Sequence, residues 1–158
     1  MKRGFFYIFF CLPLLLLRCQ TESDGLIPLR EEGDPIILFD TFSEIKLHSD
    51  WMDIRSAEME GDILRLTVWY RGGCNSHDFH LFVWKGFIET NPIQAECFLS
   101  HNSHNDLCEF WIERELAFDM RPLKQIYQQN YGAHGAFRIR IYTGNRRTIF
   151  HPLPEYRF

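Results

Sequence analysis

The sequence predicts a single, mainly β domain, an antiparallel β-sandwich or small barrel with one short helix. About six to eight short apolar runs are separated by clusters of turn-forming residues, and only one stretch has helical spacing. The chain has 158 residues, with 15 Phe and 4 Trp to build a core. Once an N-terminal export segment is set aside, this length allows one core but not two.

The clearest pair of predicted strands is a hairpin. Residues 51–59 and 63–70 alternate between apolar and other side chains on either side of Glu60-Gly61-Asp62. Glycine supplies the positive φ that a tight turn requires. Ahead of this hairpin, the short apolar run 36–39 predicts a first strand or a covering segment.

Three further strands are expected in the middle of the chain. The run 79–84 predicts a third strand that ends at Gly86, and the run 93–99 follows the turn signal Asn91-Pro92. The run 108–118 is predicted as a strand because it is rich in aromatic residues and lies between turn signals. Its two faces carry Phe110, Ile112 and Arg114 on one side and Trp111, Glu113 and Glu115 on the other.

The predicted helix starts at Asp119 as its cap, with Pro122 early in its first turn, and ends near Gly132. A last hairpin is expected from the alternating run 137–142 and the return run 148–150. In this hairpin Arg138 and Arg140 face solvent.

The N-terminus has the pattern of an export signal, predicted over residues 1–18. Lys2 and Arg3 precede an apolar run over residues 5–17, too short for a bilayer span of about 20 residues. The following Leu15-Leu16-Leu17-Arg18-Cys19 resembles the lipobox of bacterial lipoproteins, which implies acylation of Cys19. Arg18 occupies the place where that pattern has a small residue.

Residues 19–35 are predicted to form the lipidated N-terminus and a flexible polar tether, and residues 36–158 the β-rich domain. Removing residues 1–18 leaves 14 basic and 21 acidic residues, a net charge of −7. An acidic domain without a Lys/Arg cluster excludes nucleic acid as a partner. The expected partners are a membrane, through the lipid, and an unidentified protein, glycan or small-molecule ligand.

Three cysteines remain in the domain, because Cys11 lies in the signal and Cys19 is the lipid site. An exported chain meets an oxidising compartment, which favours a disulfide between two of them. Cys97 lies in an apolar run and is predicted to be a core residue, whereas Cys74 and Cys108 are predicted to lie at strand ends beside turns. The sequence therefore predicts a Cys74–Cys108 disulfide.

A zinc or copper site is the alternative for the same stretch, with ligands drawn from Cys74, His77, His101, His104 and Cys108. A third possibility makes Cys74 a nucleophile activated by His77 or His101. Asp106 is expected to form a turn. The four tryptophans could stack on sugars, but their alternation with aliphatic residues predicts core packing for most of them.

One sequence pattern resembles a known group of proteins. It comprises Gly72-Gly73-Cys74-x-x-His77-Asp78-Phe79, then Leu99-x-His101, Cys108-Glu109 and Phe118-Asp119-x-x-Pro122-Leu123. These motifs resemble small bacterial envelope lipoproteins of unassigned function. The resemblance implies a compartment but no activity.

The functional expectation is a non-enzymatic, lipid-anchored binding or structural module of the bacterial cell envelope, with no cofactor. It rests on the export signal, the tether and the lack of a coherent catalytic set of residues. The alternative is a metal-binding or thiol-redox envelope domain that uses Cys74, His77, His101 and Cys108. The sequence does not indicate the periplasmic or the surface side.

Overall fold

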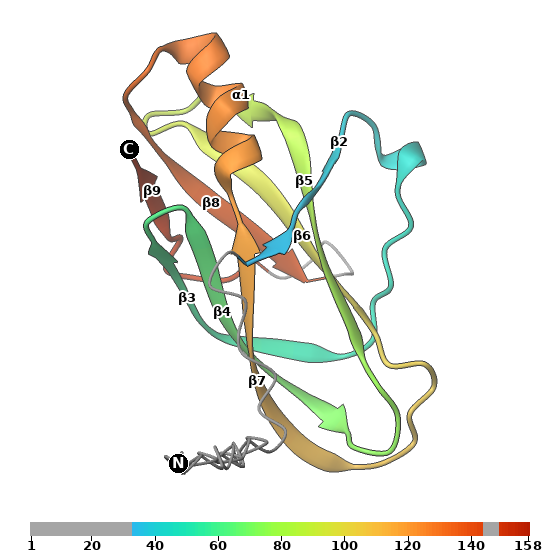
Figure 1. Cartoon of the computed structure of the whole chain (residues 1–158). Helices are drawn as coiled ribbons and strands as arrows, with labels where there is room; N and C mark the ends of the chain where they lie inside the picture. Colours follow the sequence, from blue (N-terminus) through green and yellow to red (C-terminus); the bar gives the residue numbers. More distant parts are fainter. Residues whose placement is uncertain (1–32, 144–148) are drawn as a thin grey trace, which may run out of the picture.

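Two β-sheets pack face to face in the computed structural model, which describes residues 33–143 and 149–158 (Figure 1). The strand orders are β1-β7-β4-β3 and β2-β5-β6-β8-β9. The bounds are β1 Asp34–Pro35, β2 Ile37–Phe39, β3 Met52–Glu60, β4 Ile63–Gly72, β5 Asp78–Ile88, β6 Gln94–Asn102, β7 Phe110–Asp119, β8 Ala136–Thr143 and β9 Glu155–Arg157. A 3-10 turn at Phe42–Glu44 and the helix α1, Arg121–Tyr131, complete the described elements. The predicted mainly β sandwich with one short helix is confirmed.

The sheets are mixed rather than purely antiparallel. The pairs β1/β7, β2/β5 and β6/β8 run parallel. The residues of β1 were expected in the tether, yet Asp34 and Pro35 pair with Phe118 and Asp119. The ordered domain therefore begins a few residues earlier than the sequence predicts.

The predicted β3–β4 hairpin is confirmed. It turns at Gly61, whose φ of +59° places it in the left-handed region. Alternate residues of β4 point into the sandwich, where Leu64, Leu66, Val68 and Tyr70 are buried. The intervening residues of β4, which include Trp69 and Arg71, point outward from the four-stranded sheet.

The second sheet is organised around β6 and β8. The inner faces of these strands supply Ala95, Cys97, Leu99, Phe137, Ile139 and Ile141 to the core. Cys97 is a free, fully buried cysteine, as predicted. The prediction that the third strand ends at Gly86 is wrong, because β5 continues to Ile88 through an irregularity in its pairing with β6.

Helix α1 covers the end of the sandwich that lies away from the β4–β5 loop (Figure 1). It buries Leu123 and Tyr127 and ends at Gly132, as predicted. The N-cap is Met120 rather than Asp119, but the Asp119 carboxylate still accepts the backbone N–H of Arg121. Asp119 therefore still caps the first turn of α1, although it lies one residue before the N-cap, the position that the sequence predicted for it.

The C-terminal hairpin is only partly as predicted. Strand β8 pairs antiparallel with β9, while the expected return run contributes a single bridge between Tyr142 and Ile149. Arg138 is exposed, as predicted. The predicted signal segment, Cys19 and most of the tether lie outside the described residues. Within the described ranges, no helix is long and apolar enough to cross a membrane.

Candidate functional site

Two loops meet at the end of the sandwich where β4 leads into β5 and β6 leads into β7. Cys74 lies in the first loop and Cys108 in the second, and they form the predicted disulfide with a Cα–Cα distance of 5.8 Å. The bridge closes a segment whose ends are 34 residues apart. The strands on either side supply Tyr70, Phe79 and His101, whose rings pack against one another.

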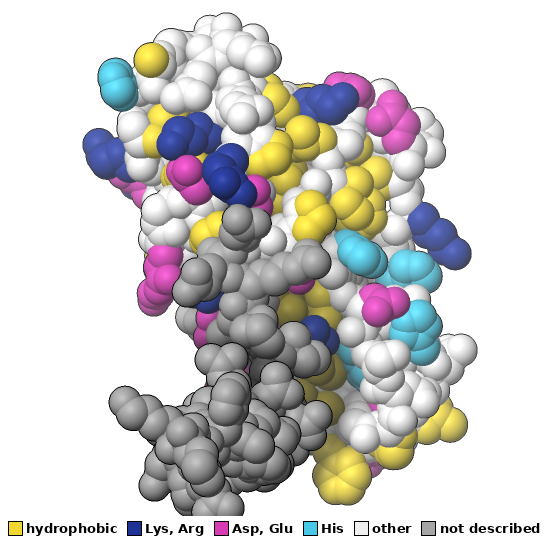
Figure 2. Space-filling model, in the orientation of Figure 1, with side chains coloured by type: hydrophobic (Ala, Val, Ile, Leu, Met, Phe, Trp, Pro, Cys, Tyr) yellow, Lys and Arg dark blue, Asp and Glu magenta, His cyan; other side chains and the backbone are white. Residues whose placement is uncertain are grey.

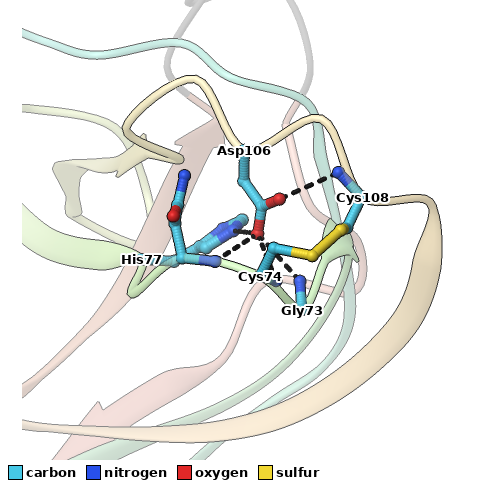
Figure 3. Close-up of a disulfide and its surroundings, with 6 residues drawn as sticks. Gly73, Cys74, His77, Asp106 and Cys108 are labelled. Carbon is cyan, nitrogen blue, oxygen red and sulfur yellow. Dashed lines mark hydrogen bonds and ion pairs between the residues drawn. A yellow bond between two sulfur atoms is a disulfide. The ribbon is translucent and has the colours of Figure 1, made fainter.

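Asp106 connects the same two loops through hydrogen bonds (Figure 3). Its Oδ2 accepts the backbone N–H groups of Gly73, Cys74 and Asn75, at 2.8, 2.9 and 2.9 Å. Its Oδ1 accepts the N–H of Cys108 at 2.9 Å. The N–H groups of Asn75 and Cys108 hold the pKa of this carboxyl well below its usual range. Asp106 is thus ionised and holds the two loops together. The sequence predicted only that it forms a turn.

A row of buried polar groups continues inward from Asp106. His77 Nε2 lies 3.2 Å from Asp106 Oδ2, and His77 Nδ1 lies 2.7 Å from His101 Nε2. His101 Nδ1 lies 3.2 Å from the backbone carbonyl oxygen of Asp50. The His77 side chain is only 2% exposed and the Asp106 side chain 0%. Burial lowers the pKa of His101, which disfavours its charged form.

The other predicted site residue, His104, does not join this row. It lies in an exposed turn, where its Nε2 is 2.7 Å from Asp78 Oδ2. His104 and Asn105 have φ values of +50° and +57°, and the N–H of Asp106 closes the turn onto the carbonyl of Ser103. The sequence predicted that His77 and His101 belong to one candidate site, but it indicated neither Asp50 nor the central role of Asp106.

The alternatives that require a free thiol do not fit this geometry. Among the described residues, Cys74, Asp106 and Cys108 place potential ligand atoms within 4.8 Å of one another. The two sulfurs are bonded to each other, however, so neither is a thiolate ligand or a nucleophile. Both His77 nitrogens are also engaged by Asp106 and His101.

Aromatic side chains gather on the outer surface of the four-stranded sheet, next to the disulfide. The Trp69 and Trp111 rings stack at 4.3 Å, and Trp51 meets Trp111 edge-on at 5.5 Å. Arg55 lies over Trp69 at 4.1 Å and Arg71 over Trp111 at 4.6 Å. We call the aromatic face the surface formed by Trp51, Arg55, Trp69, Arg71 and Trp111.

The aromatic face is exposed, contrary to the prediction that most tryptophans lie in the core. Trp51 is 57% exposed and Trp111 46%, whereas Trp69 is partly buried. Leu107, in the loop before β7, and Phe110, on the opposite face of β7 from Trp111, are exposed at the same end of the sandwich. Figure 2 shows hydrophobic side chains protruding at the end of the molecule below a group of histidines. A pocket of about 530 Å³ opens beside Trp51 and Trp111, with His101 and Asp106 also in its lining.

Gly72 is required where His77 approaches Asp106. A Cβ at this position would lie 2.4 Å from His77 Nε2 and 3.1 Å from Asp106 Oδ2. We therefore expect Gly72→Ala to displace His77 and to lower the free energy of unfolding by about 1–3 kcal/mol, the usual cost of overpacking. Urea denaturation followed by circular dichroism measures this change.

The matched control for Gly72→Ala is Gly61→Asn. Nothing would contact a Cβ at Gly61, and asparagine tolerates its left-handed conformation. The control should leave stability within about 0.5 kcal/mol of the parent chain. Equal stability of the two variants would contradict the packing described around His77.

The carboxylates of the site predict the acid sensitivity of the fold. Backbone N–H groups lower the pKa of Asp106, and the Ser103 hydroxyl lowers that of Asp50, from ordinary values of 3.8. A carboxyl whose pKa is lower in the folded state contributes stability above its unfolded pKa, and loses it as pH falls through the folded value. We therefore expect thermal stability to fall below about pH 4.

Melting temperatures recorded from pH 7 down to pH 2 would check this prediction. Asp106→Asn should lower the melting temperature at pH 7 and give a shallower acid decline than the parent chain, since its side chain no longer titrates. Parallel acid profiles for the two proteins would show that Asp106 is not the anchor described here.

Several solved structures share the fold. A NigD-like immunity protein from Bacteroides caccae superposes with a TM-score of 0.56 at 16% identity, covering 79% of this chain and 63% of that one. A putative lipoprotein from Bacteroides fragilis gives a TM-score of 0.53 at 11% identity, covering 78% and 69%. This chain thus spans less than two thirds of the immunity protein. No family model and no curated protein matches the sequence.

Proposed function

We propose that this chain is an exported, lipid-anchored protein of the bacterial cell envelope, whose domain binds a protein partner through the aromatic face. The lipobox-like sequence at Cys19 and the fold shared with a putative lipoprotein support the location. The observation that carries the binding role is the clustering of exposed aromatic side chains. Two of the exposed large hydrophobic residues, Trp51 and Trp111, lie in ring contact on this face.

The chemistry of the aromatic face favours a protein over a sugar. Trp69 and Trp111 already stack on each other, and each carries a guanidinium over its ring, so little ring surface remains for a sugar. Leu107 and Phe110, which are exposed at the same end of the sandwich, add apolar surface without a polar group to hydrogen-bond sugar hydroxyls. Trp and Arg are also the residues that most often dominate protein interfaces.

The charges of the face favour recognition by apolar contact. Arg55 pairs with Asp53 at 3.2 Å, and Arg71 lies 3.8 Å from Glu109. In each pair the charge of the arginine is balanced by a carboxylate. The face therefore has no excess positive charge to attract an anionic membrane or a strongly acidic partner. The expected partner presents an apolar patch that buries Trp51 and Trp111.

The polar groups of the site support a binding role rather than catalysis. Cys74 is oxidised, Asp106 is held by backbone N–H groups, and the two buried histidines bond to each other. None of these groups is free to act on a substrate, and the exposed His104 is paired with Asp78. A robust hydrolase or transferase activity of the purified protein would overturn the proposal.

Site-specific photo-crosslinking in the native envelope tests this function. A photo-reactive phenylalanine analogue at Trp51, an exposed member of the aromatic face, should give one discrete protein adduct. The same analogue at Tyr131, an exposed aromatic on α1 at the other end of the domain, should not. The partner identified by mass spectrometry must then bind the purified chain and lose binding to a Trp51→Ser variant. Adducts to lipid or glycan alone, or none, would contradict a protein partner.

A further inference from the structure

The row Asp106, His77, His101 and Asp50 cannot be satisfied by neutral imidazoles. It contains three short contacts between nitrogen or oxygen atoms, so three hydrogen bonds require three protons. Both ends of the row are acceptors, a carboxylate and a backbone carbonyl. Two neutral imidazoles carry only two N–H groups between their four ring nitrogens. The row therefore needs one additional proton, and with it one positive charge.

Protonating Asp106 instead would not supply the missing bond without cost. Both of its oxygens already accept backbone N–H groups, and these donors stabilise the ionised carboxylate. If both histidines were neutral, one buried acceptor would face another with no proton between them. Such an unmade hydrogen bond costs free energy because water cannot replace the missing donor.

The position of the charge follows from the surroundings of each ring. His77 faces the Asp106 carboxylate at 3.2 Å and the Tyr70 ring at 4.7 Å, while Arg114 contacts only its backbone carbonyl. His101 faces the carbonyl of Asp50 and stacks on Phe79 at 4.5 Å, and burial disfavours its charged form. His77 is thus the imidazolium, and His101 is neutral with its proton on Nδ1.

This row joins the two segments that support the aromatic face. His101 holds the carbonyl of Asp50, the residue before Trp51, and the Asp50 carboxylate accepts the N–H and hydroxyl of Ser103. Asp106 holds Cys108, in the loop that leads into β7 and Trp111. His101 and Asp106 also line the pocket beside Trp51 and Trp111.

We propose that His77 and His101 hold one shared proton against Asp106, and that this buried proton locks the Trp51 segment to Asp106, in the loop that leads into β7 and Trp111. The aromatic face is assembled while the proton is bound and loosens when it leaves at higher pH. The regulatory role rests on the proposed function of the face, whereas the protonation of the pair does not.

Ring-nitrogen NMR of the ¹⁵N-labelled full chain, purified in detergent, tests the proposal without any partner. His77→Gln and His101→Gln variants assign the signals. At pH 7 three of the four ring nitrogens should carry a proton, with His101 Nε2 the bare one. Two bare nitrogens would overturn the shared proton, even if a protein partner of the aromatic face had been found.

A titration to higher pH tests the lock. The pair should lose its proton in one step, and the indole signals of Trp51 and Trp111 should shift in the same step. Asp106→Asn should move that step down by about 1–3 pH units, because the opposite charge is gone. His104→Asn, which removes the exposed histidine paired with Asp78, should leave it in place. Unchanged indole signals during proton loss would overturn the lock, and a wild-type titration alone decides this if Asp106→Asn does not fold.

Discussion

Replacing Cys74 and Cys108 together with serine is expected to lower the free energy of unfolding by about 4 kcal/mol in the chain-entropy model. The bridge spans 34 residues, so its loss restores considerable freedom to the unfolded chain. The folded state should change little, because Asp106 still connects the two loops through four backbone N–H groups. The free energy of unfolding of a stable domain is only about 5–15 kcal/mol, so the loss of the bridge is a large effect.

Urea denaturation of the oxidised parent chain and the double variant measures the difference. A thiol reductant is the control, since it should destabilise the parent chain by a similar amount and leave the double variant unchanged. A loss well above about 4 kcal/mol, with disordered loops, would mean that the bridge holds the folded state as well. No loss at all would mean that Cys74 and Cys108 are not joined in the protein.

Local patterns in the sequence predict much of this fold. The β3–β4 hairpin, the helix and most strands follow from alternation and turn residues within about ten positions of one another. The parallel pairs, such as β6 with β8, leave no such trace, because their partners are separated by a helix and long connections. The strand β1 has only two residues, too few for any periodic signal.

The candidate site could be predicted only in part, for a related reason. The disulfide followed from the compartment and the number of cysteines. The row from Asp106 to Asp50 did not, because Asp50 and His101 lie 51 positions apart and meet only through the β-sandwich. The need for glycine at position 72 likewise could not be predicted, because it depends on the contact with His77 in the folded chain.

The outward positions of Trp69 and Trp111 could be predicted from the alternation of side chains along their strands. On β4, Trp69 shares its face with Arg65 and Arg71, while the opposite face is apolar and buried. On β7, Trp111 shares its face with Glu113 and Glu115. A tryptophan that alternates in phase with charged residues belongs on the outer face of a sheet. The exposure of Trp111 on this outer face supports the proposed binding role of the aromatic face.

Trp51→Ala is accordingly expected to weaken binding of the partner by about 30-fold or more while leaving the fold intact. Truncating an aromatic hot-spot residue typically costs about 2 kcal/mol or more of binding free energy. Trp51 is 57% exposed, so its removal should change the free energy of unfolding by no more than about 1 kcal/mol. Loss of affinity at unchanged stability separates a binding residue from a structural one.

Calorimetry with the partner found by crosslinking measures the affinity, and thermal unfolding measures the stability. Tyr131→Ala is the matched control, because Tyr131 is an exposed aromatic on α1 outside the aromatic face. It should bind the partner as the parent chain does. If Trp51→Ala and Tyr131→Ala bind equally well, the partner does not contact Trp51. If Trp51→Ala unfolds instead, the stacked tryptophans hold β3, β4 and β7 together, and the aromatic face is structural.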